Sequence, residues 1–336
     1  MMTKRTAYIR SVGRYLPERR LTNKDFEKMV DTTDEWIFTR TGIRERRILS
    51  PGLGNSHMAA PAAMECMEKA DVDPAEIDVV IVATVTPDML FPATACLVAR
   101  DIGAKNAWGF DLSAGCCGFL YAMSVGAQMI ESGRARKALI IGSDVMSTIA
   151  DYSDRNTCVL FGDAAGAALL DSCSEPGYGV LDFIHHVDGA GEPFLHMKAG
   201  GSRKPPSLET VENKEHYVFQ DGRNVFKTAV TEMAAVAAEI LAKNGLTGED
   251  VALFVPHQAN LRIIDAAAKR MGLENGKVVI NIDKYGNTTC ATLPLALYEA
   301  AVEHKYKLEK GDYVVMAAFG AGYTWGSTLL RWWDQS

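Results

Sequence analysis

The sequence predicts an α/β fold made of two duplicated halves, and three observations support that prediction. Short apolar runs rich in β-branched residues recur along the chain and are interpreted as buried strands. Helical patterns of small and apolar residues lie between them, which favours alternating layers with largely parallel sheets. The same order of elements returns after about 170 residues, a distance too long for a solenoid repeat and suited to a duplicated half.

The elements follow from these runs. In each half a strand is followed by a second strand, a turn of small residues, a helix and a third strand. The predicted strands are Val79–Val85, a strand ending near Leu112, Ala138–Gly142, Val159–Leu170, Leu253–Pro256, Val278–Ile282 and Val314–Phe319. The predicted helices are Ser56–Ala70, Gly118–Glu131, Arg223–Lys243, Leu261–Met271 and Leu293–Val302. We place the halves at 1–174 and 175–336, with a surface loop at Gly200–Lys214.

Composition excludes several classes of protein. The 336 residues are 48% hydrophobic and 23% charged, as in a soluble globular protein. The net charge of −7 argues against nucleic acid as a partner, because binding phosphate needs a basic excess. The N-terminus lacks the apolar region of a signal peptide, and no apolar run is long enough for a membrane span. Seven scattered cysteines without metal-binding spacing indicate reduced thiols, so we expect a cytoplasmic protein.

The first candidate site is a cysteine at the start of a helix. A tight turn of small residues follows the strand ending near Leu112, and Cys116 precedes the helical pattern that starts at Gly118. Free N–H groups and the dipole at a helix N-terminus favour an anion, so we expect a lowered thiol pKa. A thiolate there can attack a thioester and hold an acyl group. The alternative is that Cys116 and Cys117 are both small core residues, and Cys117 is the better candidate for packing.

Two further candidates lie at matching places in the second half. His257 follows a buried strand and comes just before a helix, on the side of an α/β sheet where ligands usually bind. Asn287 follows Gly286 between another predicted strand and a helix. Taken singly, the histidine is more often structural and the Gly-Asn pair is usually only a turn. Together with Cys116 they predict one pocket where the halves meet.

Six segments together resemble a known enzyme family. They are Asp34–Arg46, Gly109–Met123, Phe161–Asp163, His257–Arg262, Gly286–Thr288 and Phe319–Gly326. Over nearly its whole length the chain is similar to the thiolase superfamily, and most similar to 3-oxoacyl-(acyl-carrier-protein) synthase III. These enzymes initiate bacterial type II fatty acid synthesis. The resemblance implies a five-layer αβαβα core and a catalytic triad at Cys116, His257 and Asn287.

The resemblance also implies the reaction. Cys116 takes an acyl group from an acyl-CoA primer, and a malonyl group on acyl carrier protein then loses carbon dioxide and attacks the acyl-cysteine. His257 and Asn287 are expected to donate hydrogen bonds to the developing enolate, and the backbone N–H groups of Cys116 and Ala321 to the acyl-transfer oxyanion. No metal or other cofactor is expected, since CoA thioesters are substrates.

Further residues are assigned through the resemblance alone. It implies that the CoA adenine stacks between Trp36 and Arg155 and that Asn260 contacts pantetheine. It implies a homodimer in which Phe91 reaches into the partner subunit's acyl pocket. Arg262, Lys269 and Arg270 fall roughly on one face of the helix from Leu261, and with Lys227 they predict a patch for the acidic carrier protein, although an ordinary polar face is the alternative. The expected CoA contacts are Trp36, Arg40, Arg155, Asn260 and Arg262, and the expected carrier-protein patch is Lys227, Arg262, Lys269 and Arg270.

Four positions depart from the family pattern. Gly115 stands where alanine is commoner, Cys117 follows the nucleophile, Cys290 lies near Asn287, and Ala321 replaces the middle residue of a Gly-Gly-Gly turn. Alanine keeps the N–H donor but resists positive φ. These departures leave open a related condensing enzyme of secondary metabolism, of the polyketide-starter or quinolone type. A degradative thiolase, which needs a second catalytic cysteine, and a non-catalytic scaffold are less favoured alternatives.

Overall fold

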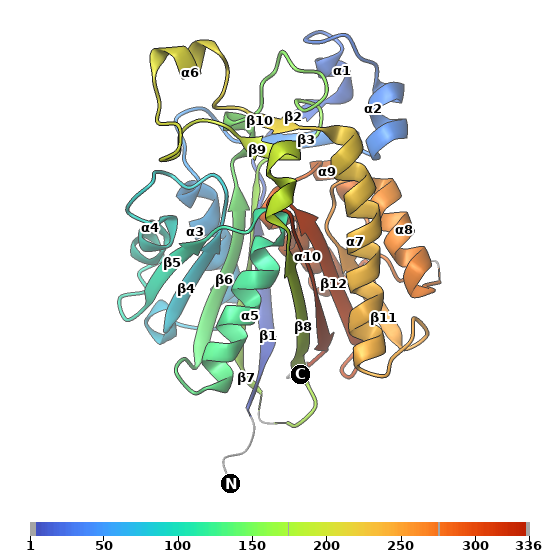
Figure 1. Ribbon diagram of the computed structural model, residues 1–336. Helices are drawn as coiled ribbons and strands as arrows, with labels where there is room; N and C mark the ends of the chain where they lie inside the picture. The colour runs from blue at the N-terminus through green and yellow to red at the C-terminus, as the bar shows by residue number, and fades with distance from the viewer. Residues whose placement is uncertain (1–4, 174, 275, 334–336) are drawn as a thin grey trace.

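The computed structural model describes residues 5–173, 175–274 and 276–333, and it confirms the predicted α/β fold. Two β-sheets stand side by side, with one helical layer between them and one outside each, so the layers run αβαβα (Figure 1). The expected boundary between the halves falls at residue 174, which lies outside the described residues.

The two sheets repeat one pairing order. The first runs β1-β7-β6-β4-β5, with two antiparallel pairs followed by two parallel pairs. The second runs β8-β13-β12-β11, and a parallel bridge from Phe254 to Val278 stands where β5 stands in the first. The strands are β1 Thr6–Tyr15, β4 Val79–Ala83, β5 Trp108–Leu112, β6 Lys137–Asp144, β7 Ala164–Cys173, β8 Gly179–Val187, β11 Val251–Pro256, β12 Tyr313–Gly320 and β13 Thr324–Arg331. The sheets are therefore mixed, not largely parallel as the sequence suggested.

Each helical layer covers one sheet face with apolar side chains. Helices α5 and α10 fill the space between the sheets, and Phe119 and Leu293 are fully buried there. Helices α3 and α4 cover the outer face of the first sheet, and α7 and α8 that of the second (Figure 1). Burial of such apolar area is the main stabilising term of the fold. The helices are α3 Ser56–Lys69, α4 Thr94–Asp101, α5 Gly118–Glu131, α7 Gly222–Lys243, α8 Leu261–Met271 and α10 Thr292–Ala301.

Two of the predicted strands are wrong in extent. Only the part from Ala164 onward of the predicted Val159–Leu170 strand is regular. The predicted Val278–Ile282 strand is reduced to its bridge with Phe254, because the Gln258 side chain accepts hydrogen bonds from the N–H groups of Asn281 and Ile282 and draws the chain away from the sheet. Strands β1, β8 and β13 were not predicted.

Short elements gather at one end of the two sheets (Figure 1). They are β2 Arg19–Thr22, α1 Asn23–Phe26, α2 Asp34–Thr41, β3 Glu45–Ile48, β9 Leu195–Met197, α6 Leu208–Glu212, β10 Val218–Gln220 and α9 Ile282–Tyr285. Helix α6 lies within the stretch that we expected to be a loop. The carboxyl ends of the parallel strands point to this end, so it is where an α/β fold places its ligands.

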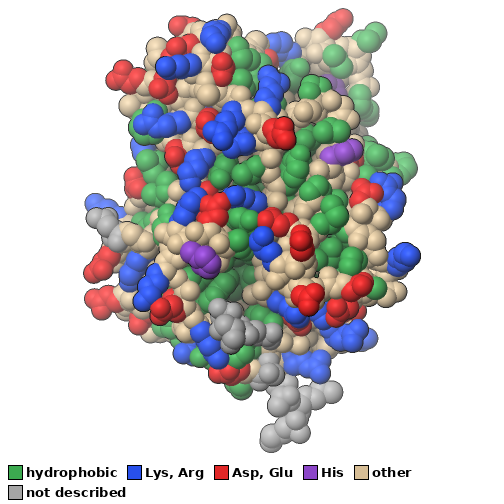
Figure 2. Space-filling model, turned by 180° about the vertical axis from the view of Figure 1, so that it is seen from behind, with side chains coloured by type: hydrophobic (Ala, Val, Ile, Leu, Met, Phe, Trp, Pro, Cys, Tyr) green, Lys and Arg blue, Asp and Glu red, His purple; other side chains and the backbone are tan. Residues whose placement is uncertain are grey.

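The surface shows no segregation of charge on the face seen from behind, where basic and acidic side chains are interspersed (Figure 2). Among the described residues, no helix combines the length and the apolar character needed to cross a bilayer.

Candidate active site

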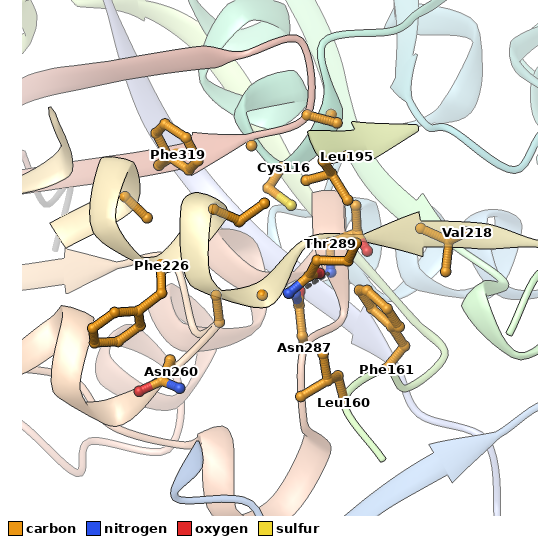
Figure 3. A pocket seen from close by; sticks show the side chains of 18 of the residues that line it. Cys116, Leu160, Phe161, Leu195, Val218, Phe226, Asn260, Asn287, Thr289 and Phe319 are labelled. Carbon is orange, nitrogen blue, oxygen red and sulfur yellow. Dashed lines mark hydrogen bonds between the residues drawn. The ribbon is translucent and has the colours of Figure 1, made fainter. Parts of the chain in front are cut away.

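The three predicted catalytic side chains line one cavity of about 620 Å³. Cys116 comes from the turn after β5, and Asn287 from the segment between α9 and α10 (Figure 3). His257 comes from the end of β11. Much of the wall is apolar and is made by residues that include Val85, Leu160, Phe161, Leu195, Val218 and Phe319. The structure thus brings together groups from both halves in one largely apolar site.

Cys116 lies in a 3₁₀ turn, Gly115–Cys117, that leads directly into α5. Burial raises the pKa of its thiol well above the usual value, and the neighbouring Cys117 and Asp144 act in the same direction. The expected lowering of this pKa is therefore contradicted for the free protein, because burial of the thiol is the largest influence on it. Cys117 is fully buried and its Sγ lies 3.4 Å from the carbonyl oxygen of Thr324, as expected of a packing residue.

His257 is held at the end of β11 by its backbone N–H, which donates to the carbonyl of Ala317 in β12 at 2.8 Å. The residue is 2% exposed, and burial lowers the pKa of its imidazole to about 3. The ring is consequently neutral at pH 7, so one nitrogen carries a proton and can donate it in a hydrogen bond. Among the described residues, Nδ1 has no hydrogen-bond partner.

The buried neutral histidine makes the protein sensitive to acid. The unfolded chain binds a proton at this imidazole near pH 6.5, whereas the folded chain binds it only near pH 3, so stability falls as pH falls through that window. At pH 5 this amounts to about 2 kcal/mol. Melting temperature should therefore drop less between pH 7 and pH 5 in His257→Gln than in the wild type or in the exposed control His57→Gln. Equal drops in all three proteins would contradict this expectation.

Asn287 is fixed on both sides. Its N–H and carbonyl pair with Leu160 and Gly162 at 2.9 and 3.0 Å, which forms a one-residue parallel bridge. Its side-chain Oδ1 accepts the backbone N–H of Thr289 at 3.0 Å (Figure 3). Because the oxygen is occupied, the amide Nδ2 is the group left to donate to a substrate in the cavity.

Two glycines allow the turn of Cys116 to approach the loop after β12. A Cβ on Gly320 would lie 2.4 Å from the amide nitrogen of Cys116, and a Cβ on Gly115 would lie 2.8 Å from that of Ala321. Ala321 does not have a positive φ, whereas Gly115 does, at +52°. Gly115 and Ala321, both departures from the family pattern, are therefore compatible with this close approach. Glycine occupies the position with positive φ, and alanine occupies a position without it.

The cavity opens beside α2, where aromatic and basic residues meet. The guanidinium groups of Arg40 and Arg155 lie 4.7 and 5.1 Å from the Trp36 ring centroid. Arg155 also donates to the carbonyl and carboxylate oxygens of Asp31. Since Arg155 already lies against the indole, an adenine can enter between them only if the guanidinium moves aside.

The remaining predicted residues belong to the expected CoA contacts, the expected acyl pocket and the expected carrier-protein patch. Asn260 caps α8 by accepting the N–H of Arg262, and its Nδ2 donates to the carbonyl of Arg40 at 2.8 Å. The Arg262 guanidinium lies 4.6 Å from the centroid of Phe226 at the cavity mouth. Phe91 does not line the cavity of its own chain and is 83% exposed. Lys227, Lys269 and Arg270 are exposed on α7 and α8, which pack side by side.

Sequence reasoning missed several wall residues. Arg223, at the start of α7, lies with Arg40 and Arg262 at the mouth of the cavity. It follows the helix cap Asp221 by two residues, and this position at the start of a helix could have been recognised in the sequence. The antiparallel pair of β9 and β10 contributes Leu195 and Val218, and these short strands carry no periodic pattern to recognise.

Cys290 does not line the cavity. Its thiol donates to the carbonyl of Gly115 at 3.2 Å, and its N–H donates to the buried carboxylate of Asp144 at 3.0 Å. Burial raises the pKa of this thiol well above its usual value. A thiol placed in this way does not serve as the second catalytic cysteine of a degradative thiolase.

Comparison with known proteins places the chain in a family. Residues 110–189 and 241–332 match the family descriptions 3-Oxoacyl-[acyl-carrier-protein (ACP)] synthase III and its C-terminal part. A curated relative named beta-ketoacyl-[acyl-carrier-protein] synthase III, from Koribacter versatilis, is 52% identical over 99% of both chains.

Solved structures agree with this assignment. A crystal structure of 3-oxoacyl-[acyl-carrier-protein] synthase III from Aquifex aeolicus is 43% identical, with a TM-score of 0.88 over 97% of this chain and 100% of the other. The priming beta-ketosynthase of the R1128 polyketide pathway is 37% identical, with a TM-score of 0.91 over 100% and 99%. The chain belongs to the 3-oxoacyl-[acyl-carrier-protein] synthase III family of acyltransferase-type condensing enzymes.

Proposed function

We propose that the protein condenses an acyl-CoA primer with malonyl-acyl carrier protein, with loss of carbon dioxide, to begin type II fatty acid synthesis. The observation that supports it most is the convergence of Cys116, His257 and Asn287 on one buried cavity. A thiol, an imidazole and a carboxamide supply what the reaction needs, which is a nucleophile and two neutral donors. Bound CoA thioesters act as substrates, and no resident cofactor takes part.

The first half-reaction is an exchange of thiol and thioester. The Cys116 sulfur attacks the primer carbonyl, the bond from that carbonyl to the CoA sulfur breaks, and the Cys116 proton ends on the departing CoA thiol. The N-terminus of α5 stabilises negative charge on Cys116 during the attack, which offsets part of the cost of burial. Backbone N–H groups of Cys116 and Ala321 receive the negative carbonyl oxygen of the tetrahedral intermediate.

The second half-reaction forms the carbon–carbon bond. The malonyl carboxylate leaves as carbon dioxide, its bonding electrons form an enolate, and the enolate carbon attacks the acyl carbon on Cys116. The Cys116 thiolate departs and takes a proton from water, which restores the thiol. His257 and Asn287 donate hydrogen bonds to the enolate oxygen, where the charge gathers. Neutral donors suit this step, and burial keeps the imidazole neutral by lowering its pKa to about 3.

Intact-mass measurement tests the nucleophile and the primer range together. Purified protein incubated with acetyl-, isobutyryl- or octanoyl-CoA should gain one acyl mass with the primers that fit, and Cys116→Ser should gain none. Cys96, which is exposed, provides the control, because Cys96→Ser should acylate normally. An acyl group found on any other residue would contradict the assignment of Cys116.

The carrier protein is proposed to dock on the basic faces of α7 and α8. Lys227, Arg262, Lys269 and Arg270 are exposed there, although Asp265 shares the face of α8. Charges at the edge of an interface mainly raise the association rate. Lys269→Glu with Arg270→Glu should therefore raise the KM for malonyl-acyl carrier protein about tenfold and leave the rate with acyl-CoA alone unchanged, as measured by steady-state kinetics. An unchanged KM would refute the patch.

A homodimer is the proposed assembly. Strand β5 forms one edge of the first sheet, and Trp108 on it is 58% exposed. The neighbouring loop exposes Leu90 and Phe91, and Asp111 of β5 caps the helix that follows this loop. An open sheet edge flanked by exposed apolar side chains is a favourable pairing surface. A monomer mass by sedimentation equilibrium would refute the dimer.

The state of the cysteines and the names of the relatives support a compartment and a pathway. All seven cysteines are unpaired, which supports the cytoplasm as the proposed compartment. A role in secondary metabolism is not favoured, since curated relatives at 51–53% identity carry the name beta-ketoacyl-[acyl-carrier-protein] synthase III and the polyketide enzyme is 37% identical.

A further inference from the structure

Thr289 is a polar residue of the cavity wall that the reaction described above does not use. It lines the same cavity as Cys116, His257 and Asn287, and it is 3% exposed (Figure 3). Its side-chain Oγ1 has no hydrogen-bond partner among the described residues. Oγ1 itself has almost no exposed surface, so contact with a substrate requires the side chain to turn about its Cα–Cβ bond. A buried hydroxyl without a partner in a cavity wall is a candidate for such a contact.

The backbone of Thr289 is strained as well. Its φ is +52°, in the left-handed region that β-branched residues rarely adopt. This conformation directs the Thr289 N–H toward Oδ1 of Asn287 at 3.0 Å. Strain and an unpartnered hydroxyl at one residue both disfavour folding, and such features persist where they serve a function.

The cavity offers few other groups for a negative charge. Its arginines, Arg40, Arg223 and Arg262, are all exposed at the mouth. Another buried hydroxyl on the wall, that of Thr41, already bonds to the backbone of Ile37 and Ile43. Among the described wall residues that are at least nine-tenths buried, Thr289 therefore supplies the hydroxyl that is free to donate.

We propose that the Thr289 hydroxyl donates a hydrogen bond to the carboxylate of the malonyl thioester, and so distinguishes it from acyl thioesters that lack this group. The proposal rests on the condensation proposed above. Only the second substrate carries a carboxylate, and its reacting carbon must reach Cys116, which lines the same cavity as Thr289.

A hydroxyl suits this position better than a cation. A lysine or arginine would stabilise the carboxylate strongly and would oppose its departure as carbon dioxide, since the charge must move to the enolate oxygen. A single neutral donor binds the malonyl carboxylate weakly in the ground state. Little binding energy is therefore lost when the negative charge moves away from the carboxylate. His257 and Asn287 then take over at the oxygen end of the enolate.

Three variants separate the hydroxyl from the shape of the residue. Thr289→Val keeps the branched volume and the N–H to Asn287 but lacks the hydroxyl, whereas Thr289→Ser keeps the hydroxyl. Thr289→Ala replaces the valine variant in the comparison if that variant does not fold. Each is assayed for acylation of Cys116 by acyl-CoA and for steady-state condensation with malonyl-acyl carrier protein.

Without the hydroxyl, the KM for malonyl-acyl carrier protein should rise roughly tenfold or more, with kcat not lowered, because a ground-state contact has been removed. Thr289→Ser should stay within about threefold of the wild type, and in every variant the acylation rate should change less than the KM for malonyl-acyl carrier protein does. The proposal fails if the KM of Thr289→Val is unchanged, if kcat falls in its place, or if Thr289→Ser is impaired equally. A wild-type protein that acylates but never condenses with malonyl-acyl carrier protein would instead refute the proposed function itself.

Discussion

His257→Ala and Asn287→Ala should each slow decarboxylation of the malonyl thioester by about 100-fold or more, while acylation of Cys116 stays within about tenfold of the wild type. The two side chains donate to an oxygen that becomes negative only in the second half-reaction. A donor aimed at developing charge in a water-poor cavity contributes most in the transition state. Release of carbon dioxide and the acyl mass increment measure the two half-reactions separately.

A matched variant distinguishes donation from shape at Asn287. In Asn287→Asp an oxygen can still accept the Thr289 N–H, but the other oxygen replaces Nδ2 and carries negative charge toward the enolate. This variant should decarboxylate no faster than Asn287→Ala despite its native size. If both half-reactions fell equally in the alanine variants, the division of roles would be wrong, and these residues would serve the cavity as a whole.

Helices were predicted from the sequence more accurately than strands. The predicted ranges of α5 and α8 agree with the structure, because each has a helical apolar pattern, and α8 also has clear ends at the Asn260 cap and at Gly272. The antiparallel strands β1, β8 and β13 escaped prediction. Polar residues interrupt their apolar runs, and their pairing with distant strands carries no local signal.

The sequence predicted the nucleophile and the hydrogen-bond donors of the candidate site. It did not predict the residues of the cavity wall or the pKa of the nucleophile. Cys116, His257 and Asn287 stand at turns next to predicted strands, so the duplicated topology already implied that they meet. The pKa of Cys116 could not be foreseen, because it depends on burial under residues from both halves. The apolar wall residues resemble core residues in sequence, and only the cavity distinguishes them.

Thr289 illustrates the same limit. In the sequence it is one of two consecutive threonines in a turn, and nothing marks it apart from Thr288. Its positive φ, its burial and its unpartnered hydroxyl are properties of the folded segment that no local sequence pattern specifies. Residues whose role arises from backbone geometry therefore need a structure to be found.

Gly320→Ala should lower the rate of Cys116 acylation by about 100-fold or more. The added Cβ would lie 2.4 Å from the amide nitrogen and 3.0 Å from the Cβ of Cys116. Both atoms belong to Cys116 itself, so the steric clash is relieved only if the end of β12 moves away from the turn of Cys116. That movement separates the N–H groups of Cys116 and Ala321, which are proposed to receive one oxyanion together.

Stopped-flow or mass-based acylation kinetics with the best primer measure this effect. Overpacking of this kind costs about 1–3 kcal/mol of stability, so a thermal melt must show that the variant remains folded at the assay temperature. Gly189→Ala is the matched control, because no atom lies within 4 Å of its added Cβ and its φ is not positive. A folded Gly320→Ala protein that acylates at the wild-type rate would show that the oxyanion is stabilised elsewhere in the cavity.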